Sequence, residues 1–166
     1  MPTASAIVER WARETERRLR AVLREAAQDV AENVSVGGAY SPGTPVDTGF
    51  ARAQWQATLG ETTPVAVDPP AGLQEGALAS AGEAAASEMN LVCGAAEITD
   101  VISLTNGSRY LPYLEDGSTE PRTERVAKDG TVTQLPYHSG WIAETVHAWP
   151  TIVQRATGRV KRAFGA

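Results

Sequence analysis

The chain has a single cysteine, Cys93, among its 166 residues. One cysteine cannot form an intramolecular disulfide, and it cannot supply the ligands of a cysteine-based zinc site. The composition therefore excludes a disulfide-stapled scaffold and a zinc ribbon, and it fits a reducing compartment. Because Cys93 lies between Val92 and Gly94, we expect a buried thiol and not a nucleophile.

Long apolar runs are also missing, and aromatic residues make up only 6% of the chain. No run approaches the roughly 20 apolar residues that a transmembrane helix requires. Glu9 and Arg10 interrupt the first apolar segment too early for a signal peptide. We therefore expect no membrane contact and a cytoplasmic site of synthesis. With 42% hydrophobic residues the chain can still bury a core, and residues 1–166 fit a single domain.

Basic residues are outnumbered 15 to 20 by acidic ones, which gives a formal net charge of -5. Residues 1–24 hold six Arg and three Glu, and residues 155–162 hold four basic residues, so the remainder carries -12. An acidic centre does not fit broad, high-affinity DNA binding, which requires clustered Lys and Arg. Basic ends and an acidic centre fit either docking between charged partners or an ordinary solvated surface.

Catalytic motifs are absent from the sequence. There is no Gly-x-Ser-x-Gly elbow and no glycine-rich phosphate loop with Lys. The two histidines, His138 and His147, are nine positions apart and lack the i, i+4 spacing of a helical zinc pair. The other polar candidates for a catalytic group are Asp47, Glu115 and Ser139. We predict no enzyme, no metal site and no cofactor.

Three segments predict helices. Residues 4–35 place apolar side chains at spacings of three and four, and Gly37 and Gly38 end the pattern. Such a helix would be about 45 Å long, which exceeds what a small domain needs for its own core. Part of its apolar face is therefore expected to meet a neighbouring subunit. Residues 73–89 predict an alanine-rich central helix, and residues 141–164 predict a last helix that Pro150 either kinks or restarts.

The strand predictions depend on alternation. Residues 51–59 alternate apolar and polar side chains, and residues 98–105 predict a second strand. Residues 108–114 fit a third strand or a short helical turn. Residues 117–139 are too long to remain without structure in a compact domain, so we expect a projecting loop, with a short strand at 131–135. The predicted fold class is α+β, a small antiparallel sheet packed by a long N-terminal helix, a central helix and a C-terminal helix.

Three blocks of sequence follow each other in an order that resembles a known family. The first is Pro-Val-Asp-Thr-Gly at residues 45–49, in which Asp47 is expected to form an Asx-turn with Gly49. The second block contains Asn106, Tyr110, Tyr113, Leu114, Glu115, Gly117 and Ser118. The third block is residues 140–153. In this order the blocks resemble the tail-completion or neck proteins, minor tail components that join head and tail in long-tailed double-stranded DNA phages. The alanine-rich insert around residues 64–95 and the long loop after Gly117 depart from the family pattern.

The resemblance implies a structural protein of the virion, assembled in the cytoplasm of the bacterial host and located at the head–tail junction. It implies a homo-oligomeric ring, commonly a hexamer. The ring would stack between the head connector or adaptor protein and the tail terminator or tail tube protein. Double-stranded DNA would pass through the ring. An acidic channel, lined by the middle of the chain, would repel phosphate and let the DNA slide.

Eight residues are our candidates for contacts with neighbouring proteins, because charged loops and turns often carry interaction surfaces. They are Trp11, Arg18, Asp47, Tyr113, Glu115, Arg122, Arg125 and Lys128. Tyr110 and Tyr113 are expected to bury their rings at a sheet edge, and Glu115 to meet an Arg of an adjacent subunit. Two alternative functions remain. One is a tail terminator that caps the tail tube, and the other is a non-structural protein-binding module whose acidic centre mimics DNA.

Overall fold

The fold is built around one long helix. The computed structural model describes residues 3–45, 48–74, 76–117, 124–126, 132–134 and 139–165, and only the backbone of the two short segments. Helix α1 (Ala4–Ser35) begins where Thr3 Oγ1 accepts the N–H of Ala6 at 3.3 Å. The predicted first helix is therefore confirmed over its whole length.

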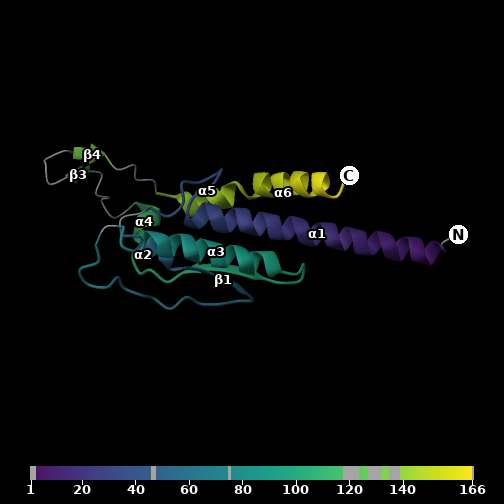
Figure 1. The fold of residues 1–166 in the computed structure, drawn as a ribbon, viewed down its shortest axis with the longest axis horizontal. Helices are drawn as coiled ribbons and strands as arrows, with labels where there is room; N and C mark the ends of the chain where they lie inside the picture. Colours follow the sequence, from purple (N-terminus) through teal and green to yellow (C-terminus); the bar gives the residue numbers. More distant parts are fainter. Residues whose placement is uncertain are drawn as a thin grey trace.

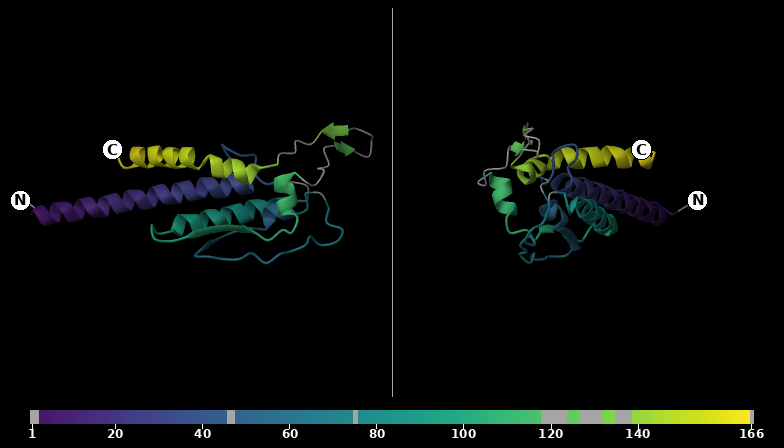
Figure 2. Two further views of the ribbon diagram at one scale, coloured as in Figure 1. Left: turned by 180° about the vertical axis from the view of Figure 1, so that it is seen from behind. Right: turned by 60° about the vertical axis from the view of Figure 1, so that its left-hand side comes forward.

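Two helices lie antiparallel to α1, one on each side (Figures 1 and 2). Helix α3 (Ala79–Ala95) is joined to α1 by Arg24, which donates to the carbonyl oxygen of Ala96 at 2.7 Å. Helix α6 (Trp149–Ala163) is joined to α1 by Arg159, which donates to Glu25 at 2.5 Å and to Asp29 at 2.8 Å. These contacts hold the second half of α1 between two neighbours.

A two-stranded sheet packs against α3 on the side away from α6 (Figure 1). Strand β1 (Trp55–Leu59) pairs antiparallel with β2 (Ile102–Asn106), with Trp55 opposite Asn106 and Leu59 opposite Ile102. Strands β3 (Glu124–Val126) and β4 (Val132–Gln134) form a separate antiparallel pair, in the segment where one short strand was predicted. The predicted α+β class and the small antiparallel sheet are confirmed.

The core is rich in alanine, which lets the helices approach closely. One cluster joins α1, β1, α3 and α5 (Trp141–His147), and the second joins α1 to α6. The largest fully buried side chains of the core are those of Trp141, Met89 and Ile152. The buried residues of the first cluster are Ala27, Ala31, Val34, Ala51, Trp55, Met89, Cys93, Leu111 and Trp141, and those of the second are Ala26, Ile152 and Ala156.

The carbonyl oxygen of Val34 joins three parts of the chain. It belongs to the last turn of α1, where carbonyl groups have no partner within the helix. Thr44 Oγ1 donates to it at 2.8 Å, and Trp141 Nε1 donates to it at 3.1 Å. Thr44 Oγ1 in turn accepts the indole N–H of Trp55 at 2.7 Å. The end of α1, the following loop, β1 and α5 are therefore fixed to one another.

The strand predicted at residues 51–59 is wrong over its first part. A short helix, α2 (Phe50–Ala53), occupies that part, and β1 begins only at Trp55. Gly49 precedes α2 with a φ of 84°, and a Cβ there would lie 2.5 Å from the backbone of Leu78. The chain therefore turns tightly against the start of α3, and alternation alone does not report that turn.

Other boundaries differ from the prediction because of local turns. Helix α3 begins six positions later than predicted, after a turn in which Leu78 donates its N–H to Thr48. Strand β2 begins at Ile102, because Asp100 accepts the N–H of Glu97 at 2.8 Å and closes a turn first. Residues 111–116 are helix α4 (Leu111–Asp116), the helical alternative of that prediction. The last predicted helix is divided at Ala148 into α5 and α6, so Pro150 marks a restart.

Candidate interaction surface

The first turns of α1 extend beyond the helices that cover the rest of it (Figures 1 and 2). Helix α6 ends at Ala163, and the ring of the next residue, Phe164, lies 4.7 Å from the guanidinium carbon of Arg17. The α3 side ends where Glu97 pairs with Arg20 at 2.7 Å. We call residues 4–16 the α1 overhang.

Large apolar side chains of the α1 overhang are exposed. Ile7 is 47% exposed, Val8 is 63% exposed and Trp11 is 68% exposed. Further along α1, Val22 and Ala26 pack with Ile152 and Ala156 of α6. The same helix is therefore apolar both where its own chain covers it and where the chain does not.

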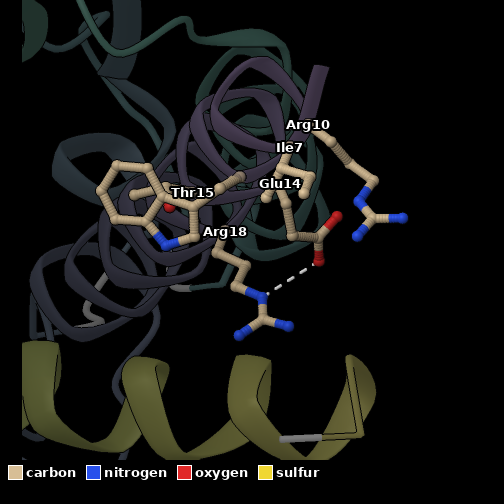
Figure 3. Close-up of a pocket in the computed structure, with 6 residues that line it drawn as sticks. Ile7, Arg10, Glu14, Thr15 and Arg18 are labelled. Atoms are coloured by element: carbon tan, nitrogen blue, oxygen red, sulfur yellow. Dashed lines mark hydrogen bonds and ion pairs between the residues drawn. The ribbon is translucent and has the colours of Figure 1, made fainter. Parts of the chain in front are cut away.

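A shallow depression with a volume of about 460 Å³ lies on one face of the first half of α1 (Figure 3). The six residues that line it are spaced three and four apart, so they form one stripe of the helix. They are Ile7, Arg10, Trp11, Glu14, Thr15 and Arg18. We call this stripe the α1 groove. The groove extends from the end of α6 towards the N-terminus of α1. At the α6 end of the groove, Arg18 reaches towards the α6 ribbon (Figure 3).

The charges of the groove are only partly balanced within the chain. Arg18 Nε donates to Glu14 Oε1 at 3.0 Å, and Arg13 lies 3.7 Å from Glu9 outside the groove. Arg10 has no acidic partner among the residues that the structure describes, whereas Arg18 is drawn paired with Glu14 (Figure 3). The groove therefore combines two exposed apolar side chains with one unbalanced positive charge.

Among the predicted interface residues, Trp11 and Arg18 lie together in the groove. Tyr113 lies on helix α4 and is 55% exposed, so the expected burial of its ring at a sheet edge is wrong, and β3 contains Arg125. Asp47, Arg122 and Lys128 lie outside the described residues, as does the predicted Asx-turn of Asp47. The prediction missed Ile7 and Arg10, although their spacing of four and one from Trp11 was a readable signal.

Glu115 is occupied within its own chain. Its Oε1 accepts the N–H groups of Ile142 at 3.1 Å and Ala143 at 3.0 Å, and its Oε2 lies 3.2 Å from the Ile142 nitrogen. These groups belong to the first turn of α5, where backbone N–H groups lack helical partners and a negative charge is favoured. The carboxylate thus fixes α4 to α5, whereas the sequence led us to expect a partner in another subunit.

The remaining polar candidates do not form a cluster in the described part of the chain. Ser139 is exposed before α5, His147 is exposed in its last turn, and His138 lies outside the described residues. Cys93 is 0% exposed, and burial raises the pKa of its thiol, as expected for a structural cysteine. Within the described segments, no group of three His, Cys, Asp or Glu residues is placed to hold a metal ion. None of the helices described is long and apolar enough to cross a membrane.

The comparisons with known proteins add no assignment. No family model matches the chain, and neither a curated protein nor a solved structure matches it.

Proposed function

We propose that this chain is a structural subunit of the head–tail junction of a long-tailed phage, where it forms a tail-completion or neck ring. The observation that carries the proposal is the α1 overhang, which presents Ile7, Val8 and Trp11 to solvent beyond the body of the protein. A subunit of an assembly needs such a surface, because its function is to bind its neighbours.

The chemistry of the groove fits protein–protein contact. Trp and Arg are enriched among the residues that dominate the energy of protein interfaces, and Trp11 and Arg18 line the groove together. Burying the Trp11 ring against a partner would remove a large apolar surface from water. A helix is also a rigid element, so the surface is preorganised for binding.

Described residues of the second and third sequence blocks help to hold the end of α1. Asn106 Nδ2 donates to the carbonyl oxygen of Ala51 at 2.7 Å, and the hydroxyl of Tyr110 accepts the N–H of Ala51 at 3.1 Å. Glu115 holds the start of α5, and Trp141 within α5 reaches the end of α1. Residues of the second and third blocks therefore act in one network, which supports reading the blocks as a unit.

In this proposal the protein resides in the virion as a homo-oligomeric ring, commonly of six subunits. The head connector or adaptor would bind one side of the ring, and the tail terminator or tail tube would bind the other. The acidic middle of the chain, with its charge of -12 outside the basic ends, would face the DNA passage. Negative charge there would keep the DNA from binding as it moves through the ring.

Deletion of the gene, followed by electron microscopy of the particles, tests this function. We expect full heads beside unjoined tails of normal length, and rescue by a plasmid that carries the wild-type gene. Overlong or ragged tails would replace the proposal with a tail terminator. Normal infectious particles would contradict a structural role and favour a non-structural binding module.

A further inference from the structure

Helix α3 has an exposed face of small and apolar residues, which points away from α1. The buried residues of the helix, among them Met89 and Cys93, lie on its opposite side. At the centre of the outward face is Leu91, with 75% of its side chain exposed. The exposed small and apolar residues of this face follow at spacings of three and four, and they are Ser80, Ala84, Ser87, Leu91 and Ala95. We call them the α3 outward face.

Acidic residues flank the α3 outward face on both sides. At about 100° per residue, Glu83 falls on one side of the stripe and Glu88 on the other. Both are exposed, and the helix contains no Lys or Arg. Among the described residues, Glu83 pairs only weakly with Arg52, whose nearest nitrogen lies 3.9 Å away. The face therefore combines small side chains and one exposed leucine with negative charge at its edges.

The α1 groove has the opposite properties. It presents the bulky side chains of Ile7 and Trp11, and its Arg10 lacks an acidic partner in the described part of the chain. Bulky side chains pack well into a helix face of small residues, because the two helix axes can then approach closely. Opposite charges at the rim favour the same register and disfavour other partners.

We propose that the α1 groove of one copy of this chain packs against the α3 outward face of a second copy. A chain cannot make this contact with itself. Its α3 lies beside the second half of α1, where Gln28 donates to the carbonyl oxygen of Asn90 at 3.0 Å, and its outward face is turned away from α1. In the proposed contact, the groove is therefore occupied by another molecule of the same chain.

The two surfaces of this contact are different, so the contact is head-to-tail. Each copy uses its α1 groove towards one neighbour and its α3 outward face towards the other. Repeating this contact gives a closed ring when a whole number of rotations between neighbours makes a full turn. Any other rotation gives an open filament. The inference rests on the proposed ring and specifies which surfaces build it.

Disulfide cross-linking between two differently tagged chains tests the contact. One chain carries Trp11→Cys and the other carries Leu91→Cys, and both are otherwise full length. The native Cys93 does not compete, because it is fully buried. Under mild oxidation at high protein concentration, we expect the mixed disulfide between the two chains to form in excess of both symmetric products.

The matched control replaces Leu91→Cys with Val65→Cys, at a residue that is 80% exposed and lies outside both surfaces. The expected yield with this control is that of random collision. Equal yields for Leu91→Cys and Val65→Cys would overturn the proposal. A dominant disulfide between two copies of Trp11→Cys would overturn it too, because that product indicates a twofold contact between overhangs.

A complementation experiment gives an independent measurement of the same contact. Trp11→Glu destroys the groove and Leu91→Glu destroys the α3 outward face, so each variant alone should remain monomeric in sedimentation. Their mixture retains one intact groove and one intact face, and it should form dimers and nothing larger. Monomers in the mixture, or a wild-type chain that stays monomeric at millimolar concentration, would overturn the proposal.

Charge reversal should show the same pairing. Arg10→Glu is expected to weaken self-association by roughly tenfold, the change that one lost contact of ordinary strength produces. Glu88→Arg in the same chain should recover most of that loss, whereas no recovery would contradict the pairing of Arg10 with the acidic edge of the α3 outward face. These outcomes are separate from the gene deletion. Cross-linking without a particle defect would support the contact and contradict the proposed function. A particle defect without cross-linking would support the function and contradict the contact.

Discussion

The indole nitrogen of Trp141 donates to the carbonyl oxygen of Val34 at 3.1 Å, across a separation of 107 residues. This bond fixes the start of α5 to the last turn of α1. Thr44 donates to the same oxygen at 2.8 Å, so one carbonyl group receives two donors. The two buried tryptophans of the core, Trp55 and Trp141, are thereby joined through a single threonine and a single carbonyl group.

Loss of the Trp141 hydrogen bond should destabilise the whole fold. Trp141→Phe removes the donor and leaves a small void in the core, so we expect the free energy of unfolding to fall by about 1–3 kcal/mol. Chemical denaturation measures the change. Trp149→Phe is the matched control, because Trp149 is exposed, and its expected change is within about 0.5 kcal/mol. Equal losses for the two variants would contradict the role of the bond.

The shared carbonyl group predicts non-additivity. Thr44→Val removes the second donor to Val34 and also the acceptor of Trp55. Combined with Trp141→Phe, it leaves the Val34 oxygen buried with no donor from either side chain. The double variant should differ from the sum of the single losses by at least about 0.5 kcal/mol in a denaturation cycle. Strict additivity would show that the two bonds are independent.

Glu115 should stabilise the chain through α5. Glu115→Ala removes the acceptor of the Ile142 and Ala143 N–H groups, and we expect a loss of about 1–2 kcal/mol in the free energy of unfolding. Glu115→Gln retains an acceptor and should lose less. Glu61→Ala is the control, because Glu61 is exposed with no hydrogen bond or ion pair in the described structure. An Ala variant as stable as the control would return Glu115 to the candidates for contact with another subunit.

Because of Cys93, the free energy of unfolding should depend on pH in the alkaline range. Burial raises the pKa of its thiol, so between the unfolded and folded pKa values the native state holds a proton that the unfolded state has lost. Stability therefore declines as pH rises above roughly 8.5, the ordinary pKa of a cysteine. Cys93→Ala should not show this part of the decline, measured by denaturation at several pH values. Parallel curves for the two proteins would contradict the prediction.

Removal of most of the α1 overhang, residues 4–13, should spare the fold. A chain that begins at Glu14 loses only exposed residues of α1, so its thermal unfolding midpoint should change little. Its self-association should be lost, because Ile7 and Trp11 are gone. Circular dichroism follows the first property and sedimentation the second. A truncated chain that is unfolded would show that the overhang belongs to the core.

Much of the fold could be predicted from the sequence. Helix α1 follows from the spacing of its apolar residues, and the division at Pro150 follows from the missing N–H of proline. The turn before α2 could not be predicted, because it depends on the close approach of Gly49 to Leu78, far along the chain. The start of β2 likewise depends on one side-chain bond of Asp100.

The candidate surface could be predicted only in part. Trp11 and Arg18 are visible as an apolar and a basic residue on one helix, but exposure depends on where α3 and α6 end. Glu115 shows the converse. Its turn sequence indicated a surface role, and its partner, the first turn of α5, follows only from the packing of α4 against α5. Leu91 is one of many apolar residues in α3 until the buried face is known.

The position of the protein in a finished particle tests the proposed head–tail function most directly. A tag placed after Ala166 can be labelled with gold, and labelled particles can be viewed by electron microscopy. We expect one cluster of label per particle, between the head and the tail. Label at the distal tip of the tail, or particles without label, would contradict a position at the head–tail junction.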